Sequence, residues 1–370
     1  MDIQGDKTLG YVKDKVSQLV ASGKSETLDH TSVPHNVQEL FIHSGYRQVD
    51  SGFRSACWSL FKWHNETLNT WTHMCGLFYF LYIFSTCDEL RALLSDLPVS
   101  QLLPFYAYCL AACFVYVASS GAHLFHCVSM FWHDSCFLVD YLAIGIYGCF
   151  TGIVYYYYNY INLPSILRDL DNIYLPIILA SCLLSTWAAF ASRLGHSPLR
   201  HVIRTSSFST GFIICSAPCI YRVLLYMFST PWGKDPADIF VHDNKTHGTL
   251  VLRESEYCVS YIFHFTYLVT AASVNMSRMP ERFFPGSFDI VGHSHQWFHI
   301  FIFLGMRQRF WLIVSDVARY HNKLKSSDYT ETSSLLCKVS ACYVVFIIAL
   351  IGIIFWYSNQ VTHQDKEKKK

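Results

Sequence analysis

Long apolar runs separated by short polar connections occupy most of this chain between residues 69 and 358. A helix needs roughly 20 apolar residues to cross a hydrocarbon core of about 30 Å. Continuous apolar runs, rather than ten-residue stretches of alternating character, favour helices over a membrane-spanning barrel. The pattern therefore predicts an all-α, polytopic transmembrane helical bundle of seven core helices plus an eighth, C-terminal helix. The predicted spans fall near residues 69–88, 101–126, 135–158, 173–192, 205–229, 256–276, 291–311 and 338–358.

The polar connections divide the chain into segments. We expect a cytoplasmic N-terminal segment (1–68), the seven-helix core (69–311), a connecting segment (312–337), the eighth helix (338–358) and a basic tail (359–370). Composition agrees, because only 15% of the residues are charged, against roughly 25% in soluble domains. The formal net charge of +1 offers no basic field for nucleic acid, so membrane lipids are the expected surroundings. The 14 cysteines form no C-x-x-C pair and are typical of reduced packing residues.

Basic residues in the short connections predict the orientation in the membrane. They are more frequent in the N-terminal segment and in the connections after the fourth and sixth runs. A glycosylation acceptor at Asn244 lies on the opposite side. The N-terminus is therefore expected in the cytoplasm, in the plasma membrane or the endoplasmic reticulum. Basic residues between Arg307 and Lys325 oppose this assignment. Either the seventh run is followed by an unusual basic outer segment, or the eighth run is not a true crossing. The final residues 366–370 have the form of a dilysine retrieval address, with a plain basic tail as the alternative.

Four of the ionisable residues inside the apolar runs are informative, because a charge there costs several kcal/mol unless it is paired or functional. They are His123, Asp140, His295 and His299. His295 and His299 are four residues apart, so they share one helix face and could bind one metal ion. Alternating helix directions place all four at the same, cytoplasmic depth. Three histidines and an oxygen ligand suit zinc, with one position open for water. Interfacial histidines that bond to water or headgroups are the alternative.

Other polar residues near these four give weaker signals. Ser119 lies four residues before His123 and shares its face. His126 is interpreted as facing the headgroups, with a spare ligand as the alternative, and His293 is an equally open candidate for supporting the ligand pair. Arg47 and Glu66 are either an ion pair or ordinary solvated charges. The four tyrosines at 155–158 are predicted to form an interfacial aromatic belt.

A set of motifs between residues 45 and 305 resembles the progestin and adipoQ receptor family. The motifs are Gly45-Tyr46-Arg47, His64-Asn65-Glu66-Thr67 followed by Asn69, Trp71, Thr72 and His73, then Ser119-x-x-x-His123, Asp140-Tyr141 and Gly292-His293-Ser294-His295-Gln296-x-x-His299. The resemblance implies that His123, His295 and His299 bind Zn2+, that Asp140 holds a water, and that Ser119 lies beside them. The stretch 280–289 and the eighth helix look closer to the membrane progestin receptor branch. A more distant similarity links the family to alkaline ceramidases.

Three functions follow from the motifs. The resemblance and the long aromatic runs favour a receptor for a steroid (progestin-like) or related lipid ligand, acting on a cytosolic signalling protein. The alternative is a zinc-dependent, ceramidase-like hydrolase of a lipid amide, in which Asp140 and Ser119 would be catalytic. In a third interpretation, zinc only staples three helices together.

Overall fold

The computed structural model describes residues 27–159, 171–194, 199–229, 250–326 and 332–368. Within these ranges the regular elements are helices, and the one pairing of extended chain is an isolated bridge between Leu28 and Tyr46. The predicted all-α class is confirmed. The glycosylation acceptor at Asn244 and the last two residues of the basic tail lie outside the described residues.

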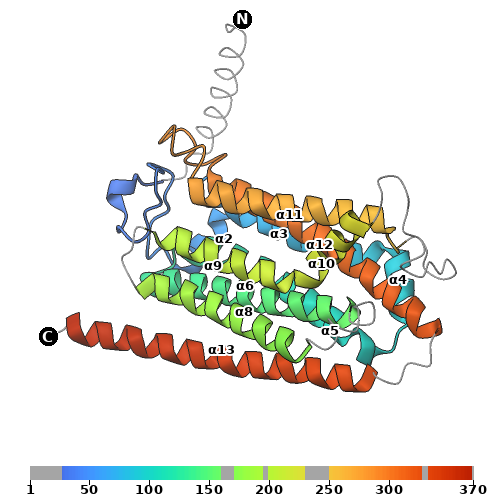
Figure 1. Ribbon diagram of the computed structural model, residues 1–370. Coiled ribbons are helices and arrows are strands. Elements are labelled where there is room, and N and C mark those ends of the chain that lie inside the picture. The colour runs from blue at the N-terminus through green and yellow to red at the C-terminus, as the bar shows by residue number, and fades with distance from the viewer. Residues whose placement is uncertain (1–26, 160–170, 195–198, 230–249, 327–331, 369–370) are drawn as a thin grey trace, which may run out of the picture.

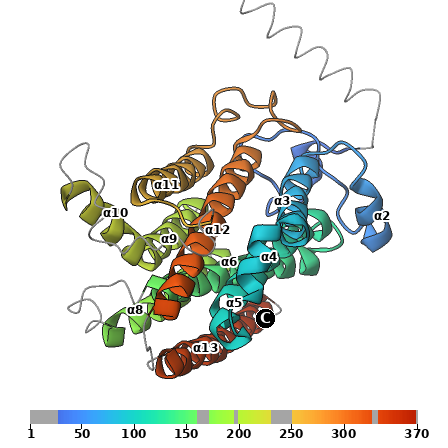
Figure 2. The same cartoon turned by 90° about the vertical axis from the view of Figure 1, so that its right-hand side faces the viewer.

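The long helices lie side by side in one bundle (Figure 1), and α6 lies near its centre when the bundle is viewed along its length (Figure 2). The bundle helices are α3 (Thr67–Thr86), α5 (Val99–Phe125), α6 (Met130–Asn159), α8 (Asp171–Leu194), α9 (Arg200–Cys215), α10 (Ala217–Ser229), α11 (Glu254–Ser277), α12 (Ser294–Ser326) and α13 (Thr332–Lys368). Shorter helices are η1 (His30–Ser32), α2 (Gly52–Ser59) and α4 (Asp88–Ser95).

Five helices of the described chain are long and apolar enough to cross a membrane, and the pair α9 and α10 makes a sixth if it is one bent span. The five are α5, α6, α8, α11 and α13. The predicted fifth run is broken at Ser216, with a bend of 61° between its halves. Pro218 explains the break, since proline has no N–H to donate and its ring crowds the preceding turn. The chain is therefore a multi-pass membrane protein.

Helices α3 and α12 lack an equally long apolar stretch, because they carry polar residues that the bundle buries. Asn69 and His73 of α3 are buried, as are Arg309 and Asp316 of α12. Helix α12 also continues past residue 311, the predicted end of the seventh span, to Ser326. Helix α13 packs along α8, α6 and α5, so the bundle shields one side of it. Intramembrane polar residues that face the bundle interior mark candidate functional positions.

The tyrosine run at the end of α6 is part of the core. Tyr155, Tyr156, Tyr157 and Tyr158 are each no more than 1% exposed. The predicted interfacial belt is therefore wrong. The physical reason is the central position of α6, which other helices contact on several sides, so that even consecutive side chains are covered by protein. Tyr320 of α12 packs against both Tyr157 and Tyr158.

Helices α3 and α5 approach closely where α3 has a glycine. A methyl group at Gly76 would lie 2.5 Å from the ring of Tyr116. Small residues allow this close approach between helices in membranes. Tyr116 in turn meets His73 edge-to-face, with 5.4 Å between the ring centroids. The contact between α3 and α5 therefore also positions His73, whose ring stacks on that of His299.

Candidate metal centre

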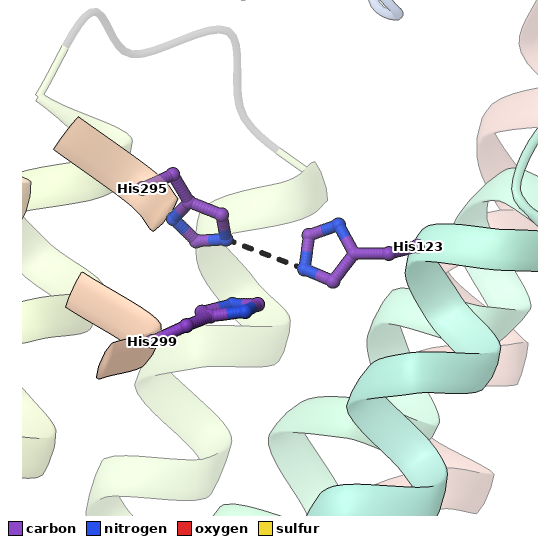
Figure 3. A group of neighbouring side chains, drawn as sticks. All are labelled: His123, His295 and His299. Carbon is purple, nitrogen blue, oxygen red and sulfur yellow. Dashed lines mark hydrogen bonds between the residues drawn. The ribbon is translucent and has the colours of Figure 1, made fainter. Parts of the chain in front are cut away.

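Three histidines converge at one end of the bundle. His123 comes from the last turn of α5, and His295 and His299 come from the first two turns of α12. Each offers one ligand atom, and these atoms lie within 4.8 Å of one another. Figure 3 shows the imidazole of His123 pointing across to the other two. This cluster could hold a metal ion, as the sequence predicted for these residues.

An outer partner fixes the ring orientation of two of these histidines. The Nδ1–H of His123 donates to a carboxylate oxygen of Glu66, at 2.7 Å. The Nδ1 of His295 lies 3.3 Å from the amide oxygen of Asn275, whose NH2 group donates to Thr205. Because Nδ1 carries the proton in each ring, Nε2 keeps its lone pair for a metal. Such outer partners are usual for histidines that bind metals.

His299 is held in the same way by α3. Its Nδ1 lies 3.1 Å from the backbone carbonyl of Asn69 and 3.1 Å from the hydroxyl of Thr72. Its ring stacks on that of His73, with 3.8 Å between centroids and 21° between planes. Each of the three rings therefore has its Nδ1 bonded outward. The three Nε2 atoms remain available toward one another.

The separation of two of these nitrogens fits a shared cation. The Nε2 atoms of His123 and His295 are 3.3 Å apart (Figure 3). Both rings already carry a proton on Nδ1, so two lone pairs face each other, which is unfavourable unless a positive ion lies between them. Two nitrogens that each lie 2.0–2.1 Å from a tetrahedral zinc are separated by roughly 3.3 Å. The geometry thus matches the donor set of an imidazole-bound metal.

The start of α12 is anchored before the first ligand. The carboxylate of Glu281 accepts hydrogen bonds from the backbone N–H and the hydroxyl of Ser294. Gln296 donates to the carbonyl of Ile290 at 2.7 Å and accepts from the N–H of Gly292 at 2.6 Å. Gly292 has a φ of 90°, a conformation that L side chains rarely adopt. These contacts set the rotation of the helix and hence the direction of both histidines.

Glu66 is the N-cap residue of α3 and is buried, 7% exposed. Burial raises the pKa of its carboxyl, but His123, His126 and the amide of Asn69 outweigh that effect and hold it well below its usual range, so Glu66 is a carboxylate. The backbone N–H of Glu66 donates to Nδ1 of His64, at 3.1 Å. Burial also lowers the pKa of His64, to about 3, so this acceptor is a neutral imidazole.

Arg47 does not pair with Glu66 in the described structure. Its guanidinium donates instead to the carbonyls of His123 and Leu124 at the C-terminal end of α5, and to the hydroxyl of Ser59. A cation at this end also complements the helix dipole. Arg47 and Glu66 therefore both bind the last turn of α5. Arg47 binds its backbone carbonyls, and Glu66 binds the imidazole of His123.

His126 and His293, the two other histidines that the sequence singled out, are buried. His126 is 8% exposed, and its Nε2 lies 3.9 Å from Glu66, so the interpretation that it faces headgroups is wrong. The pre-membrane segment covers this end of α5 and removes it from the surface. His293 is also buried, and its Nε2 lies 3.0 Å from the carbonyl of Asn65. It therefore holds the segment before α3 rather than touching the ligand histidines directly.

The histidines open onto a cavity of about 530 Å³ inside the bundle. Asp140 and Ser119 line it, together with His123, His295 and His299. One carboxylate oxygen of Asp140 is buried and has no hydrogen-bond partner within the described residues. An orphaned carboxylate oxygen in a cavity wall is a ready acceptor for a water molecule. Asp140 and Ser119 are therefore wall residues of the same cavity as the three histidines.

Fold and site together define a polytopic helical membrane protein with a histidine centre at one end of its bundle. The profile of haemolysin-III related proteins matches residues 61–309, which include all three histidines. The chain belongs to this family, that of the progestin and adipoQ receptors.

Curated relatives that are 27–30% identical to this chain are named membrane progestin receptors. Membrane progestin receptor gamma-A of Danio rerio is 29% identical over 327 residues, covering 86% of this chain and 92% of that protein. Membrane progestin receptor delta of Homo sapiens is 30% identical over 295 residues, covering 76% and 78%. Membrane progestin receptor gamma of Mus musculus is 27% identical over 329 residues, covering 88% and 91%. The predicted resemblance is confirmed, and the chain is similar to these receptors over most of its length.

Proposed function

We propose that this membrane protein is a receptor for a steroid-like or related lipid ligand and that its three histidines hold a Zn2+ ion. The observation that carries the proposal is the convergence of three outward-anchored imidazoles on a cavity of about 530 Å³. Cavities of roughly 300–1,000 Å³ suit small lipophilic ligands. The names of the relatives support a progestin-like steroid as the first ligand to test.

The test uses the full-length protein, purified in a neutral detergent. Metal analysis should find one zinc per chain, and a labelled progestin should bind saturably. Ile302→Trp, which fills the cavity wall, should weaken binding by at least tenfold, whereas Val344→Trp on the exposed side of α13 should not. Zinc-loaded, folded protein that shows no saturable binding of the progestin would overturn the steroid as the ligand of this receptor.

A second function is favoured by the orphaned oxygen of Asp140. When bound, zinc supplies a Lewis acid that activates water or polarises a carbonyl. Asp140 can orient a water in the cavity and accept its proton, and Ser119 lies on the same wall, which suits hydrolysis of a lipid amide. Asp140→Asn should then abolish release of fatty acid from ceramide while metal content stays at one zinc per chain. If no amide turnover is detected in wild-type protein with and without a chelator, the hydrolase is excluded. If substitution of His295 only prevented folding, the result would instead support the interpretation in which zinc merely holds three helices together.

We further propose that the histidine end of the bundle faces the cytoplasm and a signalling partner there. Two of the basic residues that opposed this orientation, Arg309 and Arg319, are engaged within the bundle. Arg309 is buried, and Arg319 pairs with Glu254 at 2.6 Å. A glycosylation acceptor inserted before residue 45 should remain unmodified, while the one at Asn244 should be used. The reverse pattern would overturn the orientation.

A further inference from the structure

A second polar group lies deep in the same cavity, away from the histidine centre. Arg309 of α12 is only 3% exposed. Its Nε and one terminal nitrogen lie 3.2 Å and 3.1 Å from Nε2 of His264, and the other terminal nitrogen donates to Thr151 at 3.3 Å. These contacts tie α12 to α11 and α6. They place a permanent cation inside the bundle.

The cluster carries an uncompensated positive charge. The Nδ1–H of His264 donates to the carbonyl of Gly305, at 2.8 Å, and its Nε2 accepts from Arg309. His264 is therefore neutral, and the guanidinium contributes the only charge. No carboxylate of the described residues forms an ion pair with Arg309. A buried cation without a counterion is costly, so it is retained where it has a partner or a function.

Arg309 lines the cavity together with aromatic rings that pack around its guanidinium. The guanidinium carbon lies 4.6 Å from the ring centre of Phe212 and 5.3 Å from that of Tyr147. Arg309, His264, Phe212 and Tyr147 all line the cavity. Tyr147 is buried, and its hydroxyl has no hydrogen-bond partner among the described residues. The guanidinium has two N–H groups beyond the three already bonded to His264 and Thr151, and it lines the same cavity as the phenol of Tyr147.

The distance to the histidine centre suits a ligand with two ends. Arg309 and His299 are ten residues apart in α12, which corresponds to roughly 15 Å along the helix axis. The cavity is lined along both positions. A molecule that reached Arg309 would therefore have its other end toward the histidines.

We propose that Arg309 binds the terminal oxyanion, a carboxylate or a sulfate, of an amphipathic lipid whose apolar body fills the cavity. Arginine presents a fork of donors that matches such oxygens, and Tyr147 supplies a further donor. The inference rests on the proposed function in placing a lipid in this cavity. It adds the class of ligand, since a neutral lipid leaves the charge of Arg309 unpaired and an oxyanion neutralises it.

The test compares matched lipids that differ only in the anion. Pregnenolone sulfate is measured against pregnenolone, and palmitate against palmityl alcohol, as binding to the full-length protein in a neutral detergent. Wild-type protein should bind the anionic member of at least one pair tenfold or more tightly, and the pair that does so identifies the apolar body. Arg309→Gln should remove that preference, while Arg307→Gln, on the exposed face of the same helix, should keep it. Arg309→Lys, which keeps the charge without the fork, should retain part of the preference.

The remaining outcomes separate the explanations. Equal binding of anionic and neutral lipids by wild-type protein overturns this inference and leaves the receptor proposal standing. No binding of any of the four lipids overturns both. A preference that disappears with a zinc chelator but survives Arg309→Gln would place the anion at the histidine centre and overturn the role of Arg309. If Arg309→Gln fails to fold, the binding of anionic and neutral lipids by wild-type protein and by Arg309→Lys still tests the inference.

Discussion

A carboxylate oxygen of Glu66 lies 2.7 Å from Nδ1 of His123, although the two residues are 57 positions apart in the chain. Glu66 is the N-cap of α3 and His123 lies in the last turn of α5, so the hydrogen bond joins the two helices at the candidate metal centre. Because the bond sets which nitrogen of His123 carries the proton, it also sets which nitrogen can bind a metal.

Replacing Glu66 by glutamine should weaken zinc binding by about 10- to 100-fold, the usual cost of losing such an outer partner. Glutamine keeps an acceptor oxygen but removes the negative charge that strengthens the imidazole as a ligand. The measurement is competition with a zinc chelator in purified protein. Glu89→Gln, at an exposed position of α4, is the matched control and should leave the affinity unchanged. An unaltered affinity in Glu66→Gln would show that the carboxylate does not support the ligand.

Substitution of the histidines should separate ligands from neighbours. Alanine at His123, His295 or His299 should each lower bound zinc to well under one per chain, because two imidazoles do not complete the site. His126→Ala should keep one zinc per chain, since His126 is not among the three clustered histidines. Metal analysis after gel filtration gives the answer. If His126→Ala lost its zinc while His295→Ala kept it, the assignment of the three ligands would be wrong.

Much of the fold could be predicted from the sequence, because apolar length is a direct signal of a span. The bend at Ser216 and the extension of α12 to Ser326 were missed, since local breaks depend on how neighbouring helices pack. The buried tyrosines at 155–158 were misplaced for the same reason. Aromatic residues favour both the interface and a core, and only the central position of α6 decides between them.

The candidate site could be predicted in part. The spacing of His295 and His299 and the alternation of helix direction brought three histidines and Asp140 to one end. The roles of Glu66 and His73 could not be predicted, because they depend on side-chain contacts between helices far apart in sequence. In the sequence, Arg309 is one of the basic residues that bear only on orientation, and burial by packing is what makes it a cavity residue.

Gly76→Ala should destabilise the bundle by about 1–3 kcal/mol, the usual cost of overpacking. The added methyl would lie 2.5 Å from the ring of Tyr116, and that ring is wedged against His73 and Phe80. Thermal unfolding in detergent measures the effect. Gly121→Ala is the control, because a methyl group there meets nothing within 4 Å. Equal stability of the two variants would show that α3 and α5 can separate without cost.

Glu254→Ala should be more damaging, costing about 3–5 kcal/mol, because it breaks a buried ion-pair network at the other end of the bundle. Glu254 makes two charge-assisted hydrogen bonds with Arg222, at 2.8 Å and 2.7 Å, and pairs with Arg319 at 2.6 Å. Asp316 neutralises only part of the remaining charge through its bond to Arg222, at 2.8 Å. The neighbouring Arg253, whose side chain is 61% exposed, is the matched control, and its alanine variant should lose no more than about 1 kcal/mol. Since this network lies away from the histidines, folded Glu254→Ala protein should still bind one zinc per chain, and a stability equal to that of Arg253→Ala would contradict the buried pairing.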